Sequence, residues 1–157
     1  LIGGASRSHR FADEDARNLA TQLKSLLAQG VGMMVTTSRR TGATQTRIIR
    51  DALAGTKAYV WNGEGDNPYF GLLACADAIL VTSESTNMVV EAAATGKPVY
   101  VIDLPGGEPK FDRLHASLRE RGIARPFAGK IEHWTYPPLN ETARIAQIIR
   151  GKIGLSP

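Results

Sequence analysis

The chain has 157 residues, 43% of them hydrophobic and 22% charged, which predicts one soluble globular domain with a substantial core. No apolar stretch approaches the length of a membrane span and no signal peptide is recognisable. A single cysteine excludes an internal disulfide, and these three features together predict a cytoplasmic protein. The net charge is +4, but basic residues are scattered among acidic ones, so we expect a small anionic ligand rather than nucleic acid.

Strands and helices are predicted to alternate along nearly the whole chain. In order, the predicted elements are a strand remnant at 1–2, a helix at 13–29, a strand at 32–37, a helix at 43–54, a strand at 57–61, a short helix at 68–74, a strand at 78–81, a helix at 88–95, a strand at 99–102, a helix at 110–121 and a last helix from about 140 to 152. Residues 122–138 are expected to be irregular. The start inside a strand, without a methionine, indicates a fragment of a longer protein.

This alternation predicts the fold class. Strands joined by helices imply parallel crossovers, and strands that are continuous apolar runs are typical of a sheet covered on both faces. The sequence therefore predicts an α/β fold with a doubly wound, Rossmann-like parallel sheet of about five to six strands and helices on both faces.

The most informative stretch is the strand–turn–helix–strand unit at 78–103. Its polar turn, residues 82–87, follows a strand and precedes a helix, which is where parallel α/β sheets bind anions. Glu84, Asn87 and Glu91 are spaced i, i+3, i+7 and are expected to share one helix face. A nucleoside diphosphate with its phosphates at the helix start could then reach Glu91 with its hydroxyls. Alternatively, Ser85 or Thr86 merely caps the helix and Glu91 is solvated.

Polar or glycine-rich loops follow four of the predicted strands, at 3–10, 36–42, 62–67 and 82–87. In a doubly wound sheet these loops share one rim. Glycines in the first loop would let the backbone approach a phosphate, and Arg39 and Arg40 in the second could bind phosphate bidentately. The sequence therefore predicts an anionic small-molecule site at this rim.

The sequence offers little support for metal, nucleophilic or dinucleotide chemistry. His9, His115 and His133 have no metal-ligand spacing, and His115 is expected to be a surface or packing residue. Cys75 is expected to end a helix as a small core residue. GxSxG, GxxxxGK[ST] and GxGxxG patterns are absent, so we expect no metal, cofactor or dinucleotide.

Two resemblances are carried by these residues. The stretch SESTNMVVEAAATGKPVYV, at 83–101, resembles the nucleotide-binding motif in the C-terminal domain of GT-B glycosyltransferases, and GGAS at 3–6 resembles the glycine-rich loop of that domain. A closer resemblance, to bacterial members of the mitochondrial fission ELM1-like family, covers nearly the whole chain. It is carried by residues 1–4, 67–77, 82–101, 111–127 and 134–140.

The resemblance implies that residues 1–157 form the GT-B-like C-terminal, nucleotide-binding domain of a two-domain protein. Its implied ligand is a nucleoside diphosphate or nucleotide-sugar, with Glu91 at the ribose. With the loop arginines included, the candidate ligand-binding residues are Gly4, Ser6, Arg7, Ser38, Arg39, Arg40, Ser83, Ser85, Thr86, Asn87 and Glu91. Catalytic groups would come largely from the other domain, so none is assigned here.

Three functions are compatible with this pattern. The first is the donor half of a GT-B-type glycosyltransferase, which binds but does not react alone. The second is a non-catalytic scaffold that recruits a protein partner, since plant members of the family are associated with recruiting a dynamin-like protein. In that case residues 134–138 would form a contact surface. Alternatively, the aromatic residues of this segment hold the loop against the core. The third, a nucleotide-sugar epimerase, is disfavoured because a Tyr-x-x-x-Lys pair is also absent. Base, sugar, acceptor and oligomeric state stay open.

Overall fold

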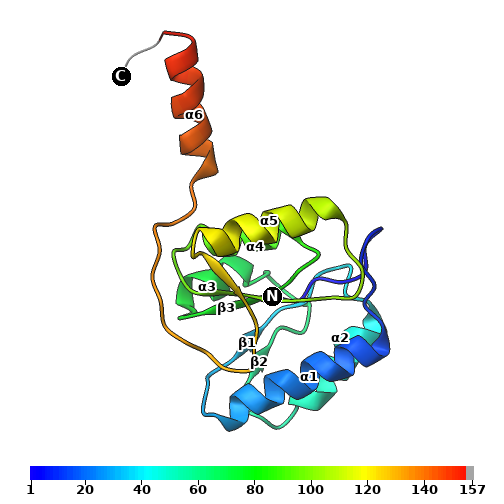
Figure 1. Ribbon diagram of the computed structural model, residues 1–157. Helices are drawn as coiled ribbons and strands as arrows, with labels where there is room; N and C mark the ends of the chain where they lie inside the picture. Colours follow the sequence, from blue (N-terminus) through cyan, green and yellow to red (C-terminus); the bar gives the residue numbers. More distant parts are fainter. Residues whose placement is uncertain (155–157) are drawn as a thin grey trace.

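The computed structural model describes residues 1–154 and is a mixed α/β fold (Figure 1). Its elements are α1 (Asp13–Ala28), β1 (Met34–Val35), α2 (Ala43–Leu53), β2 (Tyr59–Val60), α3 (Tyr69–Cys75), β3 (Ile79–Thr82), α4 (Thr86–Ala93), β4 (Val99–Ile102), α5 (Pro109–Glu120), β5 (Ala124–Pro126) and α6 (Glu141–Lys152). The predicted alternation is confirmed. None of the helices described is long and apolar enough to cross a bilayer.

All strand pairings within the named strands are parallel, but they form two small sheets. One has two strands in the order β1-β2, and the other has three in the order β3-β4-β5. Residues 1–3 lie between them. The amide of Ile2 donates to the Thr36 carbonyl at 2.9 Å, while Leu1 N donates to the Leu80 carbonyl at 2.8 Å. The first residues thus hydrogen-bond to both sheets, although they make only an isolated bridge, Ile2 to Thr37.

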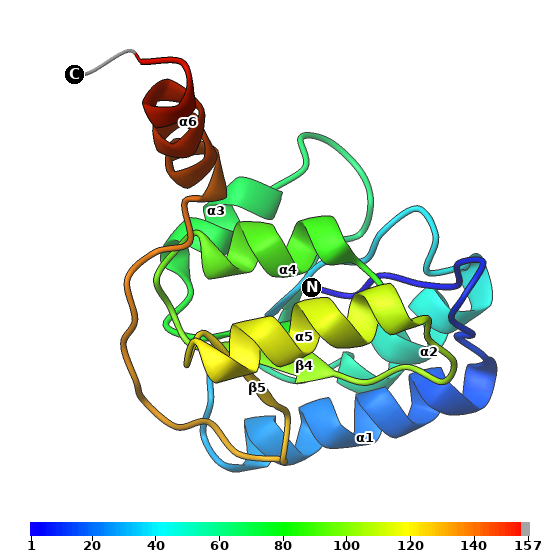
Figure 2. The ribbon, with the colours of Figure 1, turned by 45° about the horizontal axis from the view of Figure 1, so that its top comes forward.

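Helices lie on both sides of the strands. Figures 1 and 2 show α1 and α2 on one side and α4 and α5 on the other. The face of α1 that packs inward consists of Ala16, Leu19, Ala20, Leu23 and Leu26, close to the face that its periodicity predicts. Two clusters of buried side chains result, one under α1 and α2 and one between β3, β4, α4 and α5. This burial of apolar area is the main stabilising contribution.

Two expectations about local structure are wrong. The segment 122–138 is not wholly irregular, because residues 124–126 pair with β4 as β5. Arg125 and Pro126 are exposed, as suits an edge strand, so no apolar run marks this strand. Cys75 does end a helix, but it is exposed, because α3 turns Leu72 and Leu73 toward the core instead.

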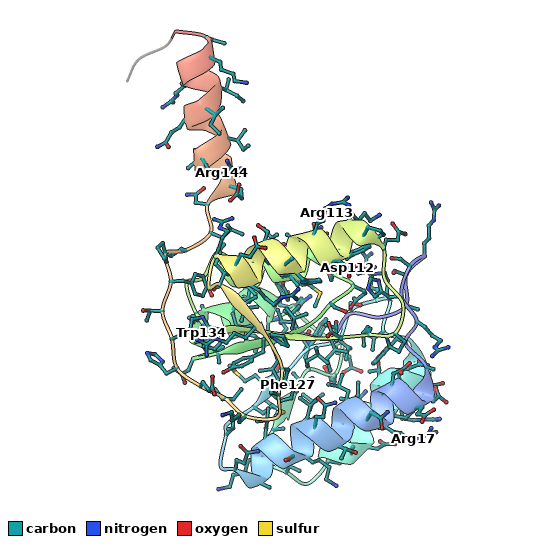
Figure 3. All side chains as sticks on the ribbon, viewed as in Figure 1. Arg17, Asp112, Arg113, Phe127, Trp134 and Arg144 are labelled. Atoms are coloured by element: carbon teal, nitrogen blue, oxygen red, sulfur yellow. The ribbon has the colours of Figure 1, made fainter. Side chains whose placement is uncertain are left out.

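The aromatic segment before α6 is fixed to the core. Trp134 lies in this segment (Figure 3). Its ring stands edge-on to Tyr100, with the ring centres 5.0 Å apart, and the Arg125 guanidinium lies 4.1 Å from the centre of the indole ring. Tyr136 is buried and its hydroxyl donates to the Lys97 carbonyl at 2.6 Å. Burial raises the pKa of Tyr136 to about 12, so this hydroxyl remains protonated at neutral pH. The structure thus favours the reading in which these aromatics hold the loop.

Removing that hydroxyl should weaken the fold measurably. Tyr136→Phe is expected to lower the free energy of unfolding by about 1 kcal/mol, because the Lys97 carbonyl loses its donor. Urea denaturation measures this, with Tyr59→Phe as the matched control, since Tyr59 is 49% exposed. Equal stability of the two variants would show that the Tyr136 hydroxyl contributes nothing.

Helix α6 begins as the sequence predicts but does not join the core. The Asn140 side chain accepts a hydrogen bond from the Ala143 amide at 3.0 Å, which caps the helix. None of its residues is buried, and it extends away from the body (Figure 1). Ile145, Ile148 and Ile149 are all substantially exposed.

Candidate functional site

The loops that follow residues 1–3, β1 and β3 are joined by direct contacts. The Thr41 hydroxyl lies 2.6 Å from the Gly3 carbonyl oxygen, and the Gly4 amide donates to Glu84 Oε1 at 2.9 Å. The Arg40 guanidinium lies 3.6 Å from the same Glu84 oxygen. These contacts bring three of the four predicted loops together at one rim.

The glycines of the first loop leave room for neighbouring groups of the protein. A Cβ atom at Gly3 would lie 1.5 Å from Glu84 Oε1, and one at Gly4 would lie 1.9 Å from the Arg40 carbonyl oxygen. Neither glycine has a positive φ, so close approach rather than backbone conformation requires them. The loop was expected to let the backbone approach a phosphate, but its Gly4 amide is already engaged by a carboxylate.

The expectation that Glu84 shares a helix face with Asn87 and Glu91 is wrong. Helix α4 begins at Thr86, so Glu84 belongs to the preceding turn and the i, i+3, i+7 spacing does not apply. Its side chain is fully buried, and among the described residues its Oε2 atom has no hydrogen-bond partner. Asn87 and Glu91 are exposed on the helix.

The start of α4 leaves its first amides free within residues 1–154. Ser85 occupies the position before the helix, but its side chain makes no capping hydrogen bond. The first helical bond runs from the Val89 amide to the Ser85 carbonyl. The amides of residues 86–88 therefore have no intrahelical partner, as at any uncapped helix start, and they carry the positive end of the helix dipole.

A pocket of about 340 Å³ opens at this rim. Its lining combines hydroxyl, guanidinium and aromatic groups and consists of Ile2, Thr36, Thr37, Ser38, Arg39, Trp61, Asn67, Tyr69 and Met88. The indole of Trp61 donates to the Glu64 carbonyl at 3.0 Å and so holds the loop at 62–67, the fourth predicted loop. Trp61 and Tyr69 are not among the predicted site residues, although Trp61 ends a strand that was expected to reach this rim.

Tyr69 joins the pocket to Glu91. Its hydroxyl donates to Glu91 Oε2 at 2.5 Å. Partial burial of Tyr69, together with the Glu91 carboxylate, raises its pKa above the ordinary range of tyrosine. The hydroxyl therefore remains a donor at neutral pH and orients the exposed carboxylate.

Ser6 and Arg7 lie in a turn of their own. The Ser6 hydroxyl accepts from the His9 amide at 3.1 Å, and His9 forms an antiparallel bridge with Gly106. No hydrogen bond among the described residues links this turn to α4. Arg7 is exposed to solvent.

Two more groups behind the rim are internally engaged. The Ser83 hydroxyl accepts from the Leu104 amide at 3.0 Å. His115, from α5, is buried, and its Nε2 lies 2.8 Å from the carbonyl oxygen of Ser83. His115 is therefore a packing residue that supports the 82–87 turn. Within residues 1–154, no three His, Cys, Asp or Glu side chains are grouped so that they could hold a metal ion.

A larger pocket, of about 550 Å³, lies between α1, β1 and β3 at the opposite ends of the strands. Apart from Cys75 and Asp77, its side chains are aliphatic or, at Met33 and Met34, thioethers. It offers no convergent polar groups. The rim is therefore the place where binding chemistry is concentrated.

The architecture defines a parallel α/β protein with a polar rim, and comparison with known proteins assigns its family. The family model described as "Mitochondrial fission ELM1" matches residues 1–153, and the chain belongs to that family. It is 40% identical over 156 residues to "Mitochondrial fission protein ELM1" of Arabidopsis thaliana, covering 97% of this chain and 36% of the relative.

A second relative is the "Uncharacterized protein RP120" of Rickettsia prowazekii (strain Madrid E). It is 33% identical over 158 residues, covering 96% of this chain and 45% of the relative. The chain therefore spans less than half the length of either relative. No solved structure matches.

Proposed function

We propose that this chain binds a nucleoside diphosphate or a nucleotide-sugar, as the donor half of a two-domain protein that resembles GT-B glycosyltransferases. The observation that carries the proposal is the pocket, whose lining includes two aromatic side chains, Trp61 and Tyr69, together with Arg39 and with Met88 from the first turn of α4. Aromatic faces stack on bases, and guanidinium and free amide groups bind phosphate.

The arrangement suggests how such a ligand would lie. Its diphosphate would meet the amides of residues 86–88 and the guanidinium groups of Arg39 and Arg40, with the hydroxyls of Ser38, Ser85 and Thr86 and the Asn87 amide nearby. Its ribose would meet Glu91, which Tyr69 orients, and its base would enter the pocket. Gly4 and Ser83 would act by shaping the loops, because their amide and hydroxyl are engaged. Ser6 and Arg7 would approach the phosphates from their separate turn.

The proposal includes a single doubly wound sheet. Residues 1–3 would be its central strand, in the order β2, β1, residues 1–3, β3, β4, β5. The support comes from their hydrogen bonds to Thr36 on one side and Leu80 on the other. In that order the crevice between the first loop and the 82–87 turn is the point where the strand order reverses, which is where such sheets bind ligands.

Calorimetric titration with UDP, GDP, ADP and inorganic pyrophosphate tests the proposal. We expect at least one nucleotide to bind, and Glu91→Ala to weaken it about tenfold while leaving pyrophosphate unchanged, because only the nucleotide has ribose hydroxyls. Glu120→Ala, at an exposed glutamate of α5, is the matched control. No binding at millimolar ligand would refute the proposal, and equal loss for both ligands would refute the role of Glu91.

The alternative is a non-catalytic scaffold that recruits a protein partner. It is favoured by the exposed isoleucines of α6 and by the family to which the chain belongs. Retained α/β structure with no nucleotide binding would leave this alternative as the better account. Glycosyl transfer by the whole protein, and a location in the cytoplasm, remain predictions.

A further inference from the structure

Glu84 places a buried negative charge inside a rim that otherwise suits anions. Its side chain is 0% exposed, whereas that of Arg40 is 48% exposed. Its Oε1 atom accepts from the Gly4 amide at 2.9 Å and lies 3.6 Å from the Arg40 guanidinium. A carboxylate therefore already holds two groups, an amide and a guanidinium, that would otherwise be available to an anionic ligand.

The surroundings fix this carboxylate in place. Gly3 leaves room for it, since a Cβ there would lie 1.5 Å from Oε1. Its Oε2 atom has no partner among the described residues, so its charge is neutralised only in part by Arg40. An anion bound to Arg40 would share that guanidinium with Glu84. The fixed carboxylate would repel the anion, and the low dielectric of the surroundings would strengthen this repulsion.

We propose that Glu84 is a specificity-determining residue, whose buried charge lowers the affinity of the rim for anions in proportion to their charge. This inference rests on the proposed function and narrows its ligand class. A free nucleoside diphosphate has a terminal phosphate oxygen that ionises near neutral pH, and a sugar ester lacks it. Glu84 therefore favours the sugar diphosphate ester over the free diphosphate.

Glu84→Gln tests this by removing the charge while keeping the shape and the acceptor for Gly4. Calorimetric titration of wild type and variant uses the pairs UDP and UDP-glucose, GDP and GDP-mannose, or ADP and ADP-glucose. We expect the variant to bind the free diphosphate about tenfold more tightly than wild type does, and to gain less affinity for the sugar ester. Glu14→Gln, at an exposed glutamate of α1, is the matched control. The melting temperature confirms that each variant folds.

A double-mutant cycle with Arg40→Gln separates the effect of charge from a change in shape. If Glu84 acts through Arg40, Glu84→Gln gains little affinity when Arg40 is already replaced.

Unchanged or weaker binding of the free diphosphate by Glu84→Gln, when wild type binds it, would overturn the inference and leave the proposed function standing. An equal gain for the free diphosphate and the ester would overturn the specificity role. Absence of binding by both proteins would refute the proposed function, and the inference with it.

Discussion

Replacing Gly4 by alanine is expected to lower the free energy of unfolding by about 3 kcal/mol. The added Cβ would lie 1.9 Å from the Arg40 carbonyl oxygen and 2.5 Å from the Thr41 amide nitrogen. These are backbone atoms, so no side-chain rotation relieves the overlap and the loop must shift. The shift would also disturb the hydrogen bond from the Gly4 amide to Glu84. Urea denaturation followed by circular dichroism measures the effect.

Gly32→Ala is the matched control for Gly4→Ala. Its new Cβ would meet nothing within 4 Å, and Gly32 does not have a positive φ. We therefore expect Gly32→Ala to be neutral or slightly stabilising, because alanine restricts the unfolded chain. An equal loss of stability in both variants would contradict the view that Gly4 is required by the close approach of the two loops.

His115→Ala is expected to cost about 2–4 kcal/mol of stability. The substitution leaves a cavity beneath α5 and removes the partner, 2.8 Å away, of the Ser83 carbonyl. Because Ser83 lies in the turn before α4, the loss should also loosen the turn that carries Glu84. Chemical denaturation gives the energy, and hydrogen exchange of the amides at 83–86 reports the loosening.

His133→Ala removes the same side chain from an exposed position and serves as the control for His115→Ala. It should change stability by less than about 0.5 kcal/mol. A similarly small effect of His115→Ala would contradict the view that α5 supports the site loop through this contact.

Much of the fold is predictable from the sequence because most of its helices have an amphipathic pattern and are followed within three residues by a glycine. Helix α2 and strand β4 lie within one residue of their predicted bounds. The parallel connections also predict which loops share an edge, so the meeting of the glycine-rich loop, the arginine loop and the 82–87 turn follows from topology alone. Strand β5 was missed because an edge strand with Arg125 and Pro126 has no apolar signature.

The details of the candidate site are less predictable, since they depend on which groups contact one another across loops. Glu84 illustrates this, because it was expected to share a helix face with Asn87 and Glu91 but lies in the turn before α4 with its side chain buried. Nothing local in the sequence specifies that its partners are Gly4 and Arg40, which are distant in the chain. The contact of Tyr69 with Glu91 depends in the same way on the packing of α3 against α4.

The position of residues 1–3 has a consequence for the order in which the chain folds. Their partner Leu80 is 79 residues away, whereas each buried cluster is built mainly from residues of one half of the chain. Closing a loop of that length costs conformational entropy, so these hydrogen bonds are expected to form late, after the local strand–helix units. Ile102 and Leu104 belong to the cluster under α1 and α2, so apolar packing joins the two halves as well, and the hydrogen bonds of residues 1–3 are expected to open before the clusters separate.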